Sequence, residues 1–160
     1  MIMLDYPGPN DDSVRGQWRA FEEMKANQLV DDLAVSNFSP AQLDAILMNP
    51  GATTKPTVNQ LPFSVAFHPR DILEYNAKRG VHVQSWSPLS RVLGRYGTEL
   101  ASIGKNYGKS GAQIGLRWIV QSGASFCTQS KSKNHFEEDL NVFDFELTSE
   151  EMKRISQLAA

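Results

Sequence analysis

Cysteine is almost absent from this sequence: Cys127 is the single one among 160 residues. The chain can therefore form no internal disulfide, and secreted proteins stapled by disulfides are excluded as a class. Few or no disulfides are typical of proteins that work in reducing compartments. We expect an intracellular location, in the cytoplasm or in an organelle matrix or stroma.

Long hydrophobic runs and an excess of one charge are also lacking. No stretch approaches the ~20 apolar residues that a membrane-spanning helix needs. The formal net charge is -2 at pH 7, whereas nucleic-acid-binding domains carry a basic patch or stripe. We therefore predict no transmembrane segment and no nucleic-acid partner.

Several signatures of catalysis are missing as well. The sequence has no P-loop and no glycine-rich dinucleotide fingerprint. The three histidines, His68, His82 and His135, do not have the spacing of metal ligands. Cys127 falls in a predicted buried strand, where a structural thiol is expected rather than a nucleophile. The sequence predicts no metal site.

What the sequence does contain is an alternation of short β-type runs with amphipathic helical patterns. Strands are expected at 2–6, 31–37, 56–63, 81–89 and 124–130, and helices at 13–30, 39–51, 70–80, 110–123, 135–143 and 148–158. The first helix is expected to begin at Asp12 or Ser13, and a glycine-rich connection is expected before residue 110. Capping boxes are predicted for Ser39 with Gln42, Ser110 with Gln113 and Thr148 with Glu151. This alternation predicts an α/β domain with a parallel sheet, and no linker divides residues 1–160.

Five motifs give the chain a family resemblance. They are LAVSNF (33–38), PTVNQ (56–60), VHVQSWSPL (81–89), AQIGLRWIVQSG (112–123) and LNVFDFELTSEEMKRI (140–155). In this order they resemble strands four to eight of the aldo-keto reductases. The resemblance implies part of a TIM-type (β/α)8 barrel, about five parallel strands with outer helices, which lacks the first three βα units. It also implies the family's reaction, the reduction of aldehydes and ketones by a nicotinamide cofactor.

The resemblance assigns the nicotinamide carboxamide to three residues. Ser36 and Asn37 match the family's pair at the end of the fifth strand, and Gln60 matches the third partner. An amide and a hydroxyl can supply both donors and acceptors to a carboxamide. The alternatives are a cap and turn for Ser36 and Asn37, and an internal hydrogen bond for Gln60.

Further cofactor positions follow in the second half of the chain. Trp86 matches the aromatic residue that stacks on the nicotinamide ring, although packing in the core is the alternative for an aromatic residue in a strand. Ser87 and Leu89 match the start of the pyrophosphate loop, and Ser130 matches a serine of the adenosine 2′-phosphate subsite.

The rest of that subsite departs from the family. Gln129 and His135 stand where lysine and arginine are common, and Glu138 stands near the expected adenine position. Lys131 and Lys133 could replace the missing charge, or they could belong to a solvated loop. The expected cofactor is NADP or NAD, and recognition of a 2′-phosphate is not predicted.

We assign no catalytic residue from the sequence. Asp5, in Leu4-Asp5-Tyr6-Pro7, occupies the position of the family's histidine. An ionised carboxylate cannot donate a hydrogen bond to a substrate carbonyl. The family's tyrosine, lysine and aspartate belong to strands one to three. We therefore expect this chain alone to be inactive and to act as a structural or interaction subunit. The alternatives are a fragment of an active NAD(P)H-dependent oxidoreductase and a non-catalytic nicotinamide-binding module.

An incomplete barrel also predicts a protein partner. Apolar side chains of the inner sheet face would meet water, and we assign Met3 or Leu4, Val35, Val58 and Val83 to that face. The strand IMLDY would form one of two open edges, which favour pairing with another chain. The expected partner is a second copy, a complementary fragment or a large assembly.

Overall fold

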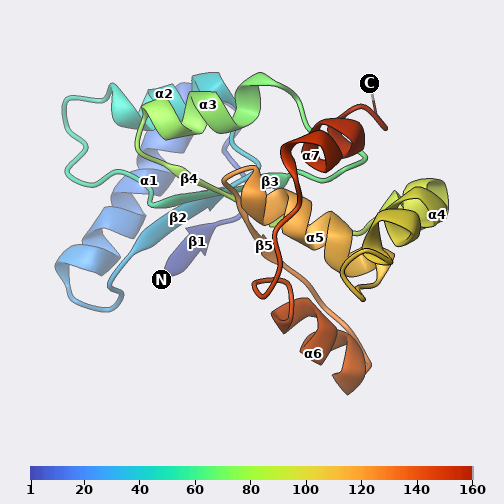
Figure 1. Ribbon diagram of the computed structural model, residues 1–160. Helices are drawn as coiled ribbons and strands as arrows, with labels where there is room; N and C mark the ends of the chain where they lie inside the picture. Colours follow the sequence, from blue (N-terminus) through green and yellow to red (C-terminus); the bar gives the residue numbers. More distant parts are fainter. Residues whose placement is uncertain (160) are drawn as a thin grey trace. The chain divides into compact units, whose positions relative to one another are not determined.

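The computed structural model of the protein describes residues 1–159 and contains a five-stranded sheet in this part of the chain (Figure 1). The strands are β1 (Ile2–Leu4), β2 (Leu33–Ser36), β3 (Val58–Pro62), β4 (His82–Trp86) and β5 (Ser125–Cys127). Their order in the sheet follows the chain, so β1 and β5 are the edges. The pairs β1–β2, β2–β3 and β4–β5 are parallel. The predicted α/β class and parallel sheet are therefore confirmed.

The chain divides into two compact units. The first combines Met1–Leu61 with Asp71–Val83, and the second combines Pro62–Arg70 with the chain from Gln84 onward. No helix within residues 1–159 is long and apolar enough to cross a membrane.

The first unit packs helices against β1 and β2. Its helices are α1 (Asp11–Ala26), α2 (Pro40–Leu47) and α3 (Asp71–Lys78). Val14 and Trp18 of α1 and Leu43 of α2 are buried in one core with Leu33 and Val35 of β2. Burial of large apolar side chains on both sides of this contact is the main stabilising contribution. The core sits beneath the strand ends that carry the polar residues described below.

Helix α1 begins earlier than the sequence predicted. Its N-cap is Asn10, whose side-chain oxygen accepts a hydrogen bond from the Ser13 N–H at 3.0 Å. Asp12 and Ser13, the predicted caps, therefore lie inside the helix. Asp11 and Asp12 occupy the first turn, where a carboxylate interacts favourably with the positive end of the helix dipole.

The second unit contains four helices, and one of them was not predicted. They are α4 (Val92–Gly104), α5 (Gly111–Gln121), α6 (Lys133–Leu140) and α7 (Ser149–Ser156). Helix α4 replaces the expected glycine-rich connection. Its apolar residues Val92, Tyr96, Leu100 and Ile103 are all buried, and their spacing follows one helical face.

Two glycines of this region, Gly104 and Gly111, have a packing role. A Cβ at Gly104 would collide with the carbonyl oxygen of Lys109. A Cβ at Gly111 would lie 3.1 Å from the Ala101 nitrogen and 3.2 Å from the Gly97 oxygen. Glycine thus lets the backbones of α4 and α5 approach closely.

The three predicted capping boxes are all present. In α2, α5 and α7 the cap side chain accepts from the third residue's N–H, and that residue's side chain accepts from the cap N–H. Each box pairs two backbone donors that the helix itself leaves unused. These local motifs set the starts of three helices.

The prediction of an exposed apolar inner face was wrong for Leu4, Val35 and Val83, whereas Met3 and Val58 are partly exposed. Val35 is 0% exposed, Val83 is 3% exposed and Leu4 is also buried. Leu4 and Val35 pair in register and belong to the core under α1 and α2. The opposite side of these strands presents smaller or partly buried residues, Met3, Ala34 and Val58. The predicted set mixed the two faces of the sheet, because Val58 lies on the side opposite Val35.

Candidate functional site

Polar residues at the end of β2 and in the middle of β3 lie together in the first unit. Ser36 and Gln60 are neighbours in the β2–β3 register. The Asn37 N–H donates to the Gln60 carbonyl oxygen at 2.9 Å, and the Asn37 side-chain amide donates to Ser36 Oγ at 3.0 Å. The structure therefore brings together the three residues predicted for the nicotinamide carboxamide.

Asn37 adopts an unusual backbone conformation at this point. Its φ is 62°, in the left-handed region that asparagine tolerates better than most residues. Its side-chain amide also reaches the backbone carbonyl oxygen of Asp5 at 3.5 Å. The end of β1, where Asp5 follows the strand, thus lies beside the end of β2. Asp5 itself is exposed.

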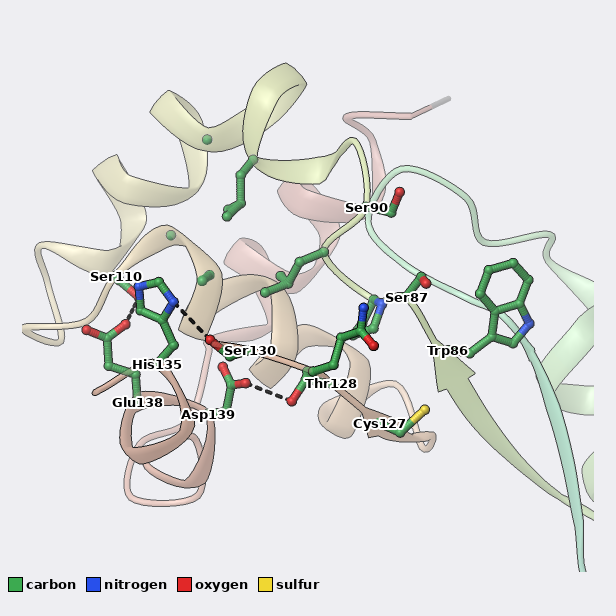
Figure 2. A pocket seen from close by; sticks show the side chains of 17 residues that line it. Trp86, Ser87, Ser90, Ser110, Cys127, Thr128, Ser130, His135, Glu138 and Asp139 are labelled. Carbon is green, nitrogen blue, oxygen red and sulfur yellow. Dashed lines mark hydrogen bonds between the residues drawn. The ribbon is translucent and has the colours of Figure 1, made fainter. Parts of the chain in front are cut away.

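The second unit contains a cavity of about 640 Å³ at the ends of β4 and β5. Trp86, Ser87, Leu89 and Ser130, the four residues predicted for this half of the cofactor site, all line it (Figure 2). A volume of this size is typical of small-molecule and cofactor sites. The carboxyl ends of the strands in parallel α/β folds are also the usual place for ligands.

Trp86 is the exposed tryptophan of the described chain. It is 37% exposed, whereas Trp18 and Trp118 are 1% and 2% exposed. Core packing, the alternative weighed for Trp86 from the sequence, is therefore wrong for this residue. An indole at a cavity wall offers an aromatic face for stacking.

The loop after β4 forms a tight turn along the cavity. The Ser90 N–H donates to the Ser87 carbonyl at 3.0 Å, and the Val92 N–H donates to the Leu89 carbonyl at 3.2 Å. Ser87 and Arg91 have φ values of 50° and 60°, a conformation that costs energy for residues other than glycine. Such strained backbone is frequent at ligand sites, and here it shapes the start of α4.

The starts of α5 and α6 complete the wall. Gly111 and Ala112, in the first turn of α5, line the cavity, and first-turn N–H groups have no partner within their own helix. Ser130 Oγ lies 3.3 Å from His135 Nδ1 and accepts from the Ser132 N–H at 3.0 Å. Figure 2 shows Ser130 facing His135, with Glu138 on the next turn of α6.

The charged residues of the cavity are acidic. Asp139 accepts a hydrogen bond from Thr128 Oγ1 at 2.8 Å, and Glu138 Oε2 lies 3.5 Å from Ser110 Oγ. The lining residues include no lysine or arginine. Lys133 is 87% exposed and pairs with Glu137 at 3.3 Å, which favours the solvated-loop interpretation for this lysine.

Cys127 is half-buried and lines the cavity, so the prediction of a buried strand residue was wrong. Burial raises the pKa of its thiol, and its Sγ lies 3.5 Å from the Ser85 carbonyl oxygen. A raised pKa leaves less thiolate at neutral pH, which favours the predicted structural thiol. Within residues 1–159, no group of three or more histidine, cysteine, aspartate and glutamate residues could hold a metal ion.

Sequence reasoning did not assign Thr128, Asp139 and the first turn of α5 to the site. Thr128 is a polar residue directly after β5, a signal close to the one that singled out Ser36 at the end of β2. Asp139 is adjacent to Glu138, but only the hydrogen bond from Thr128 reveals that it faces the cavity.

The sequence matches the Aldo/keto reductase family over residues 1–160. Protein REDOX 2 of Catharanthus roseus is 34% identical over 152 residues, which cover 91% of this chain and 46% of that protein. The 7-acetyl-epi-neemfruitin B aldo-keto reductase of Melia azedarach is 35% identical over 166 residues, covering 96% of this chain and 51% of that protein. This chain therefore spans about half the length of these relatives.

A solved structure supports the same conclusion. The aldo/keto reductase of Brucella melitensis superposes with a TM-score of 0.89 at 29% identity, covering 98% of this chain and 59% of that one. The fold is accordingly part of a (β/α)8 barrel, as the motifs predicted. The chain belongs to the aldo/keto reductase family.

Proposed function

We propose that this chain is the cofactor-binding half of an aldo-keto reductase barrel: it binds a nicotinamide dinucleotide and does not reduce carbonyl compounds by itself. The observation that carries the proposal is the cavity of about 640 Å³ in the second unit. Four residues singled out by their match to the family's cofactor positions all line it. Three of them follow one another at the end of β4, and the fold brings Ser130 to the same cavity from a segment about 40 residues away.

The residues present fit the chemistry of a dinucleotide. In the first unit, Ser36, Asn37 and Gln60 offer amide and hydroxyl groups of the kind that bind a carboxamide. The exposed indole of Trp86 would stack on an aromatic ring of the cofactor. When bound, the cofactor would supply or accept the hydride.

The phosphates require donors rather than a fixed cation. The turn from Ser87 to Ser90 and the first turn of α5 border the cavity. Backbone N–H groups at the start of a helix bind anions through hydrogen bonds and the helix dipole. Helix α4 has no side-chain cap at Arg91, and of its first N–H groups that of Val92 already donates to the Leu89 carbonyl. Ser130 would add a hydroxyl on the adenosine side.

We do not propose catalysis by this chain alone, because Asp5 occupies the position of the family's histidine. An exposed aspartate at the end of β1 is an acceptor when ionised, and it cannot donate a proton or hydrogen bond to a developing oxyanion. We propose that turnover needs residues supplied by another chain or chain segment. A second copy, a complementary fragment and a larger assembly remain the candidate partners.

Tryptophan emission during titration with NAD+ or NADP+ tests the binding. The oxidised cofactors avoid energy transfer from the two buried tryptophans, so quenching reports contact with Trp86. We expect saturable quenching that Trp86→Phe removes, while calorimetry still detects binding by this variant. Absence of calorimetric binding of both cofactors at millimolar concentration would overturn the proposal.

Two further measurements test the catalytic and partner statements. The purified protein without additions is expected to show no cofactor oxidation with a panel of aldehydes, and steady turnover would contradict this. Native mass spectrometry is expected to find the chain in a complex, and a monodisperse monomer at micromolar concentration would exclude a stable partner.

A further inference from the structure

The cavity in the second unit combines two carboxylates with no fixed positive charge. Glu138 and Asp139 are neighbours on α6 and both line it, together with Gln129, Ser130 and His135. No lysine or arginine belongs to the lining. Lys131 and Lys133 lie within four residues of both Ser130 and His135 in the sequence. Neither lysine borders the cavity, and Lys133 is already paired with Glu137.

We propose that this cavity selects dinucleotides that lack a 2′-phosphate, so that the protein binds NAD(H) in preference to NADP(H). The inference rests on the proposed function, because it assumes that the cavity holds the adenosine end of a dinucleotide. It goes further by naming the cofactor and the residues that choose it.

The physical reason is the sign of the charge that distinguishes the two ligands. A phosphate monoester carries about −1.5 to −2 charges at neutral pH. Moving it toward two carboxylates is unfavourable, and no lysine or arginine in the lining offsets the repulsion. The pyrophosphate is common to both dinucleotides, so its interaction with the same carboxylates cancels in the comparison.

A ribose hydroxyl suits the same surroundings. It can donate a hydrogen bond to a carboxylate, as acidic residues do for the 2′-hydroxyl in other NAD sites. Glu138 is suited to this role because it is exposed at the cavity and has two oxygens, of which Oε2 lies 3.5 Å from Ser110 Oγ. Asp139 is held by Thr128 at 2.8 Å and contributes mainly its negative charge.

The strength of the selection follows from exposure. Glu138 is exposed and Asp139 is half-buried, so water and salt screen both charges. Coulomb's law at a dielectric constant near that of water then gives about a fivefold to tenfold preference for NAD+ over NADP+. The preference should decrease at high ionic strength.

Isothermal titration calorimetry with NAD+ and with NADP+ tests the inference without relying on Trp86. The double variant Glu138→Gln, Asp139→Asn keeps the shape of both side chains and removes both charges. We expect it to tighten NADP+ binding at least about threefold and to bring the two dissociation constants together. Gln129→Lys, which adds a cation to the lining, should shift the ratio in the same direction.

Glu137→Gln is the matched control. Glu137 precedes Glu138 on α6, and its substitution makes the same charge change as Glu138→Gln alone, but Glu137 does not line the cavity and pairs with Lys133 instead. We expect it to leave the ratio of the two dissociation constants unchanged within about twofold. Circular dichroism of each variant confirms that the fold is retained.

The outcomes separate this inference from the proposed function. If neither dinucleotide binds the unaltered protein, the proposed function fails. If both bind and NADP+ binds as tightly or tighter, the cofactor site stands and the selection is overturned. If Glu137→Gln shifts the ratio as much as the double variant, the effect comes from net charge and the assignment to the cavity fails.

Discussion

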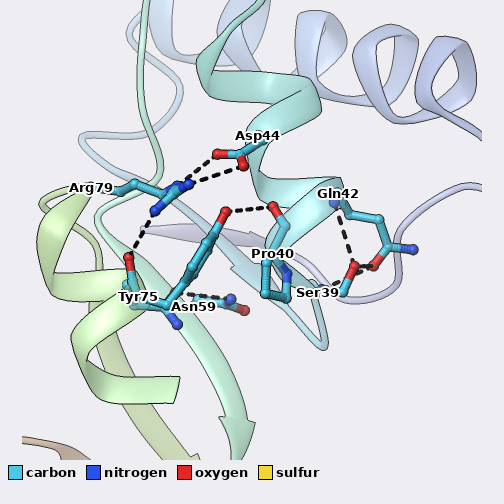
Figure 3. Close-up of polar contacts among 8 residues, drawn as sticks. Ser39, Pro40, Gln42, Asp44, Asn59, Tyr75 and Arg79 are labelled. Atoms are coloured by element: carbon cyan, nitrogen blue, oxygen red, sulfur yellow. Dashed lines mark hydrogen bonds and ion pairs between the residues drawn. The ribbon is translucent and has the colours of Figure 1, made fainter. Parts of the chain in front are cut away.

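Asp44 receives two hydrogen bonds from the guanidinium of Arg79, at 2.6 Å from Nε and 3.0 Å from Nη2 (Figure 3). The pair joins α2 to the residue that follows α3, and these helices lie side by side (Figure 1). Tyr75 belongs to the same cluster: its hydroxyl donates to the Pro40 carbonyl at 2.7 Å, and the Arg79 guanidinium stands 3.6 Å from its ring centre. A bidentate pair of this kind is stronger than a single surface contact.

The first prediction concerns Asp44→Asn. The amide keeps the shape but loses the charge, so we expect the free energy of unfolding to fall by about 1 kcal/mol. The hydrogen bond from Arg79 lowers the pKa of Asp44. A lowered pKa contributes stability that is present above the unfolded value near 4 and is lost as the pH falls through the folded value. The variant should therefore show a weaker loss of stability on acidification.

Urea unfolding at pH 7 and at several values below pH 5 measures both effects. Glu74→Gln is the control, because Glu74 and Lys78 form an ion pair on the exposed side of α3. An exposed pair contributes little, so the control should change the midpoint much less. Equal shifts for the two variants would contradict a special role for Asp44.

The second prediction concerns alkaline pH. Burial, with the nearby Asp44 charge, raises the pKa of Tyr75 to about 12. The folded protein therefore holds this proton between about pH 10 and 12, whereas the unfolded chain releases it. Stability should fall as the pH rises through this window, and Tyr75→Phe should remove part of the slope. Chemical denaturation at pH 9, 10 and 11 checks this, and an unchanged slope in Tyr75→Phe would refute it.

Local signals in the sequence predicted local structure well. The capping boxes at Ser39, Ser110 and Thr148 depend on residues three positions apart, and all three are present. The neighbourhood of Ser36 and Gln60 was also predicted correctly, because the two residues are register partners in adjacent parallel strands. The resemblance then supplied roles for Ser36 and Gln60 that geometry alone does not assign.

Features that depend on tertiary packing were missed. Periodicity cannot say which face of a strand meets the helices, and Val35 was therefore placed toward water although it is fully buried. The glycines of α4 led to the prediction of a loop. Gly104 is instead needed inside the helix, because its backbone closely approaches the Lys109 carbonyl. The orientation of Thr128 and Asp139 toward the cavity depends on a hydrogen bond between two residues that are eleven positions apart. No local sequence pattern encodes such a contact.

The third prediction compares two glycines of α4. Gly104→Ala would place a methyl group against the Lys109 carbonyl, and backbone must move to admit it. We expect a loss of about 1–3 kcal/mol of stability. Gly94 is exposed and has nothing within 4 Å of an added Cβ, so Gly94→Ala should stabilise the protein by about 0.5–1 kcal/mol through helix propensity. Thermal unfolding of both variants measures the contrast, and a loss in Gly94→Ala would show that α4 is not packed as described.

The last prediction concerns a buried hydroxyl. Tyr96 of α4 is buried, and its hydroxyl has no hydrogen-bond partner among residues 1–159. An unpaired buried hydroxyl carries a desolvation penalty, so Tyr96→Phe should leave stability unchanged or raise it by about 1 kcal/mol. Tyr107→Phe is the matched control, because the Tyr107 hydroxyl donates to Glu151 at the start of α7. The same deletion should lower stability there, since it breaks a charge-assisted hydrogen bond. Urea unfolding of the two variants separates the cases, and a loss in Tyr96→Phe comparable to that in Tyr107→Phe would mean that the Tyr96 hydroxyl has a partner, such as an internal water.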